Sequence, residues 1–139
     1  MQNHKEFFKD VIQWDIKTWV KVLPFWEKNF AIKKGMEALA IGEREGGMSL
    51  WLALKGVNVT CSDYNDFPKE TSQLHKRYKV HEKISYKKGV DVTDLSMFPE
   101  NSFDIVLFKS VLGALSEKKR QQKAFDEMKR VLKPGGAIL

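Results

Sequence analysis

The sequence has one cysteine, three histidines and no long apolar run. A lone cysteine cannot form an internal disulfide, and Cys61 lies in an apolar segment, which predicts a buried strand residue rather than a catalytic thiol. The apolar runs are far shorter than the about 18 residues that span a bilayer. Residues 1–6 also lack the charged and apolar layout of a signal peptide. These absences indicate a cytoplasmic protein without a membrane span.

The composition is typical of one globular domain. The 139 residues are 42% hydrophobic and 30% charged, and they contain no repeat or low-complexity tract. The pattern changes near residue 35, which divides the chain into an N-terminal helical segment, residues 1–34, and an α/β core, residues 35–139. We therefore expect a single domain over residues 1–139.

The N-terminal segment shows the signals of an amphipathic helix. Asn3 followed by Glu6 is typical of a helix start, and apolar residues then recur three and four positions apart up to Leu23. Pro24 ends this helix or starts the next turn. Three aromatic side chains of the segment are expected to pack in the core rather than to form a substrate wall. They are Phe7, Trp14 and Trp26.

From residue 35 onward, short apolar runs alternate with helical patterns. The predicted strands are 38–41, 58–62, 84–87, 103–109 and 137–139, and the predicted helices are 48–55, 70–78 and 117–132. Strands that alternate with helices imply right-handed crossovers and a mainly parallel sheet with helices on both faces. The sequence thus predicts a doubly wound α/β fold, in which ligands bind outside the carboxyl ends of the strands.

The segment 40–49 is the most informative part of the chain, because it joins a predicted strand to a predicted helix through a glycine-bearing turn. Such a turn directs backbone N–H groups and the positive end of a helix dipole at one point above the sheet. Gly42 and Gly46 fit a nucleotide-type loop, whereas Arg44 replaces its middle glycine. Taken alone, the pattern also fits an ordinary strand-to-helix turn.

Two aspartates follow other predicted strands. Asp63 comes about twenty residues after Gly42, the spacing at which doubly wound folds present a carboxylate to a ribose diol. Asp63 also fits a simple turn or cap. Asp91 follows the third strand and is placed to meet the exocyclic amine of a base.

The order of these motifs resembles the class I S-adenosylmethionine-dependent methyltransferases across about residues 35–139. Four segments match in order, and together they are specific where each alone is not. They are residues 39–47 (LAIGEREGG), 61–64 (CSDY), 89–92 (GVDV), and 98–106 (FPENSFDIV) with 128–136 (MKRVLKPGG). The amino-acid sequences of residues 42–47 and 108–113 also resemble those of a bacterial subgroup associated with surface-polysaccharide gene clusters.

The resemblance implies a Rossmann-like fold and a pocket for S-adenosylmethionine. The glycines are implied to line its methionine part, Asp63 to hold the ribose, Asp91 with the Val92 backbone to hold the adenine, and Tyr64 to flank the base. The full set of implied cofactor residues is Gly42, Glu43, Gly46, Asp63, Tyr64, Asp91, Val92 and Lys109.

The catalytic candidates come from the end of the fourth predicted strand. Lys109 and Ser110 occupy positions that face the reacting methyl and the acceptor in the family, although a lysine at a strand end also fits a solvated position. His75 and His81 flank a basic stretch and are expected at the surface, so no general base and no metal ligand is nominated.

The chain departs from the family pattern in three ways. Ala40 stands where the family usually has an acidic residue, and Glu43 or Glu45 could compensate. Arg44 needs a positive φ or an outward side chain. The sequence ends three residues into the fifth strand, so it looks truncated before the last strands of the family's sheet. An unpaired edge of this kind predicts marginal stability, aggregation, or completion by a partner chain, which includes a homo-oligomer formed through the exposed edge.

We expect methyl transfer from S-adenosylmethionine to a small-molecule or sugar hydroxyl. A non-catalytic remnant or partner module is the alternative that Ala40, Arg44 and the missing strands favour, and a nicotinamide-dependent dehydrogenase is a third. The net charge is +6, but the basic run 118–123 lies in a predicted helix with an apolar stripe formed by Phe125, Met128, Val131 and Leu132. We interpret the run as a solvated face, which makes a nucleic-acid partner unexpected.

Overall fold

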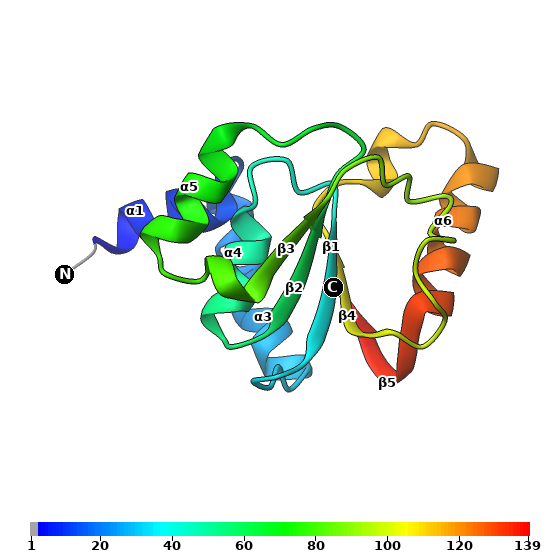
Figure 1. Ribbon diagram of the computed structural model, residues 1–139, viewed down its shortest axis with the longest axis horizontal. Helices are drawn as coiled ribbons and strands as arrows, with labels where there is room; N and C mark the ends of the chain where they lie inside the picture. The colour runs from blue at the N-terminus through cyan, green and yellow to red at the C-terminus, as the bar shows by residue number, and fades with distance from the viewer. Residues whose placement is uncertain (1–2) are drawn as a thin grey trace.

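A computed structural model describes residues 3–139 and shows one sheet with helices on both faces (Figure 1). The five strands have the order β3-β2-β1-β4-β5, and every neighbouring pair is parallel. The strands are β1 Glu37–Ile41, β2 Asn58–Ser62, β3 Ile84–Lys87, β4 Phe103–Phe108 and β5 Leu132–Ile138. The predicted doubly wound, parallel α/β fold is therefore confirmed.

The helices form unequal layers. The α-helices are α1 His4–Ile12, α2 Ile16–Trp19, α3 Val22–Asn29, α4 Gly47–Leu54, α5 Lys69–Arg77 and α6 Lys118–Val131, and the short 3-10 turns are η1 His81–Lys83 and η2 Leu112–Ala114. In Figure 1, α1, α3, α4 and α5 lie on one side of the sheet and α6 on the other. Among residues 3–139, none of the helices has both the length and the apolar character to cross a membrane.

The central strand β1 is buried on both faces. Successive side chains of a strand point to opposite faces. Ala38 and Ala40 accordingly join the core beneath α4, whereas Leu39 and Ile41 join the core beneath α6. Cys61 lies beside Ala40 in β2 and is fully buried, as predicted.

Helix α4 runs through the thicker layer and is buried along nearly its whole length. Its residues from Gly47 to Ala53 are all buried, and α1 covers its first turn. The approach is close enough that a Cβ on Gly47 would lie 2.1 Å from the Val11 carbonyl oxygen. The N-terminal segment is therefore part of the domain core, because without it the apolar face of α4 would be exposed.

The N-terminal segment is helical, as predicted, but it is not one helix. It breaks between α1 and α2, where Gln13 and Asp15 have φ values of 69° and 53°. Asn3 caps α1 by accepting a hydrogen bond from the Lys5 N–H at 3.2 Å. Pro24 is the third residue of α3, where its missing N–H costs nothing because the first four N–H groups of a helix have no intrahelical partner.

Strand β5 begins earlier than the predicted residues 137–139. Leu132 pairs with Phe103 and Ile138 with Val106, with a register shift between them. The strand follows α6 directly, and Gly135 in its middle has a φ of 80°. The first half of this strand was not predicted, because it contains the residues Lys133-Pro134-Gly135-Gly136, and proline and glycine usually mark a loop. Within residues 3–139, β5 forms one edge of the sheet.

Replacing Gly47 with alanine should destabilise the protein, although alanine is intrinsically favoured over glycine in a helix by about 1 kcal/mol. Its Cβ would collide with the backbone of α1, so we expect the free energy of unfolding to fall by about 1–3 kcal/mol. Urea unfolding and hydrogen exchange of α1 measure this. Gly113→Ala is the matched control, because a Cβ there meets nothing within 4 Å. Equal effects of both variants would contradict the close packing.

Candidate functional site

A cavity of about 500 Å³ opens at the carboxyl ends of β1, β2 and β4. This size suits a small-molecule ligand, and the position is the one at which parallel α/β sheets bind ligands. Seven residues predicted from the sequence line the cavity. They are Gly42, Asp63, Tyr64, Asp91, Val92, Lys109 and Ser110.

A smaller cavity of about 90 Å³ adjoins the large one. Glu43 and Glu45 line it, together with residues of the N-terminal segment. Trp14, Gly42 and Lys109 line both cavities and therefore mark their junction. The predicted residue Gly46 lines neither cavity and instead forms the N-cap of α4.

Both loop glycines have backbone conformations that favour glycine. Gly42 has a φ of 66°, and a Cβ there would lie 2.6 Å from the Val111 side chain. Gly46 has a φ of 78°, and a Cβ would lie 2.7 Å from the His75 ring and 2.8 Å from Thr71. Space and conformation thus both exclude a side chain at the two positions.

Arg44 is accommodated with its side chain exposed and without a positive φ. Its N–H donates to Oδ2 of Asp63 at 3.0 Å, and its carbonyl accepts from the Thr71 hydroxyl at 2.6 Å. The missing middle glycine therefore leaves the turn intact, because the Arg44 backbone is held by Asp63 after β2 on one side and by Thr71 of α5 on the other.

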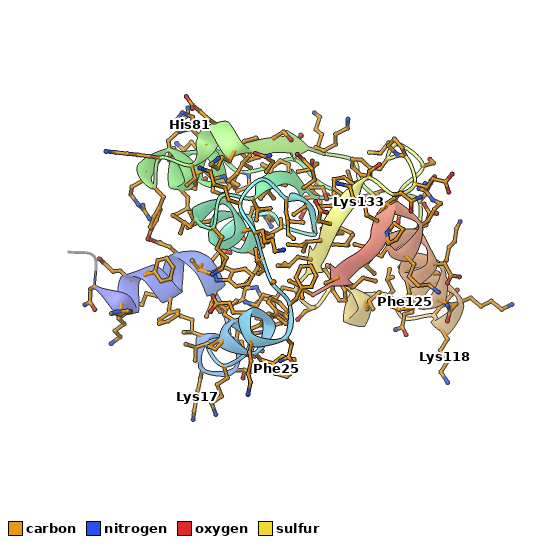
Figure 2. The ribbon with its side chains drawn as sticks, turned by 90° about the horizontal axis from the view of Figure 1, so that it is seen from below. Lys17, Phe25, His81, Lys118, Phe125 and Lys133 are labelled. Carbon is orange, nitrogen blue, oxygen red and sulfur yellow. The ribbon has the colours of Figure 1, made fainter. Side chains whose placement is uncertain are left out.

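His75 is fully buried, so the prediction of a surface position was wrong. Its Nε2 lies 2.8 Å from the Gly46 carbonyl oxygen, and its Nδ1 lies 2.5 Å from the Tyr86 hydroxyl. A carbonyl can only accept, so Nε2 donates and Nδ1 accepts from Tyr86. Burial lowers the pKa of His75, which favours this neutral form. His81, by contrast, is exposed as predicted (Figure 2).

Glu43 supplies a buried carboxylate in the turn that precedes α4. Only 7% of the residue is exposed, and its Oε1 accepts from the Ser49 hydroxyl at 2.8 Å and from the Ser49 N–H. Burial raises the pKa of Glu43 to about 7, against the opposing effect of the Ser49 hydrogen bonds. Ala40 is buried and uncharged, so Glu43 is the carboxylate that braces this loop, while Glu45 stays exposed.

Asp63 accepts hydrogen bonds from the backbone of the local turn and also lines the large cavity. Its Oδ2 accepts from the Arg44 N–H, and its Oδ1 accepts from the Asn65 N–H at 2.9 Å. Each carboxylate oxygen accepts more than one hydrogen bond, so capacity for a ligand remains. The turn role and the ligand role that the sequence left open are therefore compatible.

Asp91 is held in place by its neighbour. Its Oδ1 accepts from the Thr93 N–H at 2.8 Å and from the Thr93 hydroxyl at 2.7 Å. These hydrogen bonds lower the pKa of Asp91, so it is ionised at neutral pH. Among the described residues, no cluster of His, Cys, Asp and Glu side chains has the arrangement of a metal site.

The ammonium group of Lys109 contacts the N-terminal segment. Its Nζ donates to the carbonyl oxygens of Ile12 at 2.5 Å and Trp14 at 2.6 Å, and it lies 4.0 Å from the Trp14 ring centroid. Burial lowers the pKa of Lys109. Lys109 is thus a partly buried, hydrogen-bonded group rather than a solvated strand end, while Ser110 lies exposed beside the cavity.

Trp14 and Arg120 line the large cavity although the sequence pattern did not identify them as site residues, and Phe125 is more exposed than its pattern predicted. Trp14 was expected in the core, but 51% of it is exposed and it lines both cavities. Arg120 of the basic run also lines the large cavity. Phe125 was assigned to the apolar stripe of α6, but 40% of it is exposed, and it lies at the surface in Figure 2 near Lys118. The apolar spacing predicts one continuous helix up to Leu23, so it does not reveal that Trp14 lies in the break between α1 and α2.

Glu43 makes the stability of the fold depend on pH. Its folded pKa of about 7 exceeds the unfolded value of 4.5, so its contribution is complete below about pH 4.5 and is lost as pH rises through 7. From pH 5 to pH 8 we expect the free energy of unfolding of the wild type to fall by up to about 3 kcal/mol relative to Glu43→Gln. Urea unfolding of both proteins measures this, and parallel pH profiles would contradict it.

The family comparison matches the same part of the chain. The family model described as "Methyltransferase domain" matches residues 39–139. A demethylmenaquinone methyltransferase of Clavibacter sepedonicus is 31% identical over 105 residues, which are 76% of this chain and 40% of that protein. A tRNA N(3)-cytidine methyltransferase of Bos taurus is 32% identical over 82 residues, 58% of this chain and 21% of that protein. The chain therefore spans less than half the length of these relatives.

Solved structures share the fold. A SAM-dependent methyltransferase of Methanosarcina mazei is 28% identical, with a TM-score of 0.66 over 83% of this chain and 55% of that one. The PH0226 protein of Pyrococcus horikoshii is 23% identical, with a TM-score of 0.73 over 94% of this chain and 59% of that one. The matched segment contains the glycine loop and both cavity aspartates, and the chain belongs to the methyltransferase domain family.

Proposed function

We propose that this chain binds S-adenosylmethionine and belongs to an enzyme that transfers its methyl group to a small-molecule or sugar hydroxyl. The observation that carries the proposal is the convergence of Gly42, Asp63 and Asp91 on one cavity at the strand ends. The family membership and the names of its relatives support the same reaction class.

The residues of the two cavities fit the parts of this cofactor. Asp63 offers carboxylate oxygens to the ribose hydroxyls, and Asp91 offers one to the exocyclic amine of the adenine, with the Val92 N–H beside it. Gly42 at the junction and Glu43 in the small cavity suit the methionine part, whose ammonium needs an acceptor. Tyr64 is mostly exposed at the rim and suits a contact with the base.

The protein's part in the reaction is alignment. Bound S-adenosylmethionine supplies the methyl group for an in-line displacement, which depends on proximity and exclusion of water. Ser110 and Trp14 line the large cavity, and we assign them to the side on which an acceptor would meet the methyl. A general base is needed only for hydroxyl-type acceptors. Lys109 suits this task poorly, because two of its donors are already bound to carbonyl oxygens.

The names of the relatives do not narrow the acceptor. They describe enzymes for a demethylmenaquinone, a sterol and a tRNA cytidine. The proposal of a small acceptor rests on the cavity itself, which is open to solvent, has a volume of about 500 Å³ and has a mainly apolar lining that includes Trp14 and Val111. The basic residues Lys118 and Lys119 lie on the exposed face of α6, which supports their role as a solvated surface.

The alternative of a non-catalytic module is favoured by one observation, the uncharged Ala40 in the buried end of β1. Methyl transfer by the unmodified chain to any acceptor would exclude it. The dehydrogenase alternative has lost its support, because its loop needs glycine at Arg44 and the chain belongs to the methyltransferase domain family.

Calorimetry with S-adenosylmethionine and S-adenosylhomocysteine tests the cofactor proposal. We expect both to bind the wild type. Asp63→Asn should weaken binding about 10- to 100-fold, because it removes a charged hydrogen bond worth about 1.5–3 kcal/mol. Asp66→Asn is the matched control, since Asp66 is an exposed carboxylate on the same loop, paired with Lys88. A folded wild type that binds neither compound would overturn the proposal.

The affinity for S-adenosylmethionine should depend on pH through Glu43. Its pKa of about 7 in the folded protein means that the carboxylate becomes ionised, and able to pair with an ammonium group, as pH rises from 6 to 8. We expect the affinity of the wild type to increase over this range and that of Glu43→Gln to stay nearly flat. Calorimetry at several pH values measures both, and identical slopes would remove Glu43 from the methionine site.

A further inference from the structure

The break between α1 and α2 contains a strained turn. Gln13 has a φ of 69° and a ψ of −51°, and the Trp14 N–H donates to the Ile12 carbonyl oxygen at 2.8 Å. These values define a classic γ-turn, which is rare and costly for a residue with a side chain. Asp15 follows in the left-handed region, with a φ of 53° and a ψ of 44°. Conformations of this kind persist only when surrounding contacts hold them.

The side chain that contacts this turn comes from Lys109, which follows β4 and lines both cavities. Lys109, at the end of β4, donates to the same Ile12 carbonyl that closes the γ-turn, at 2.5 Å, and to the Trp14 carbonyl at 2.6 Å. Its ammonium also lies 4.0 Å from the Trp14 ring centroid and 5.1 Å from that of Trp19, within the range of cation–π attraction. One side chain thus joins the backbone of the turn, the Trp14 ring and the Trp19 ring of α2 to the end of β4.

The strain is concentrated at this place. Ser110, the residue after Lys109, has a φ of 63° and lines the large cavity. Among the described residues, five that are not glycine have positive φ, and three of them are Gln13, Asp15 and Ser110. Strained residues of this kind cluster at sites where geometry serves function.

We propose that Lys109 is a positioning residue that holds the turn of residues 12–15 in place at the junction of the two cavities. Trp14 then forms the wall against which the methyl acceptor is aligned. We call the contacts of Lys109 with Ile12 and Trp14 the latch. Trp14 and Lys109 are shared by the linings of both cavities, and the exposed half of Trp14 remains available for contact. The acceptor part of this inference depends on the proposed function, whereas the latch itself does not.

The latch also predicts how ligands enter and leave. Gln13 and Trp14 line the small cavity, so a released turn would uncover the compartment that Glu43 lines. A ligand that extends into both cavities could then dissociate without waiting for the turn to open. Loss of the latch should therefore increase the dissociation rate of such a ligand more than it disturbs the fold.

Hydrogen exchange of the ligand-free chain tests the latch directly. In Lys109→Met we expect exchange in residues 11–19 to become at least tenfold faster, with α6 unchanged as a measure of intact folding. Lys17→Met is the matched control, because Lys17 lies in the same segment with its side chain exposed and directed away from the domain in Figure 2. Unchanged exchange of residues 11–19 in Lys109→Met would overturn the proposal.

Two further variants separate a latch from general packing. Lys109→Arg keeps a cation with several donors and should restore slow exchange to within about threefold of the wild type. Adding Gln13→Gly to Lys109→Met should also slow the exchange, because glycine adopts a φ of 69° without strain. Failure of both variants to slow the exchange would contradict a strained turn held by hydrogen bonds.

The dissociation rate of S-adenosylhomocysteine, followed by surface plasmon resonance, provides the second readout. We expect about a tenfold increase in Lys109→Met and no change in Lys17→Met. Faster exchange with an unchanged dissociation rate would overturn the role of the turn at the junction. If the wild type binds no S-adenosylhomocysteine while the exchange results hold, the latch stands and the proposed function fails.

Discussion

The turn between β1 and α4 is held by side chains that lie outside it or fold back onto it, and the shape of both cavities depends on this support. Residues 42–47 include two glycines in left-handed conformations. Thr71 and His75 of α5 bind two carbonyl oxygens of the turn, Asp63, which follows β2, accepts one of its N–H groups, and Glu43 hydrogen-bonds to Ser49 in the first turn of α4. A backbone path of this kind would be one of many in a free chain, so the surrounding donors and acceptors select it.

The N-terminal segment both completes the core around α4 and α5 and contributes a wall of the cavities. Its first helix packs on the start of α4 at Gly47, and Asp10 of the same helix binds Arg77 and Tyr78 at the end of α5. Beyond this helix, the strained turn carries Trp14 onto the junction of the cavities. The same contacts that complete the core therefore set the position of a cavity wall, which couples the packing of the domain to the geometry of the site.

Much of the fold could be predicted because its signals are local. The alternation of strands and helices after residue 35 and the two glycines of the turn identified the parallel sheet and the edge at which ligands bind. The burial of His75 and the extent of β5 were wrongly predicted, because the neighbouring residues in the sequence do not determine them. His75 looked like a surface residue because its neighbours are basic, yet α5 turns it towards the Gly46 carbonyl. The strand β5 was underestimated because pairing with β4 overrides the loop preference of Pro134 and Gly135.

By itself, the sequence determined the doubly wound architecture, the family and the aspartates that face the large cavity. These properties follow from the periods of strands and helices and from short motifs, which each segment carries within a few residues. Only the tertiary structure decided that Glu43 is buried, that Lys109 binds the N-terminal turn and that Trp14 lines a cavity. The bond from Lys109 to Ile12 joins residues 97 positions apart, and the folded backbone is what brings such donors and acceptors together.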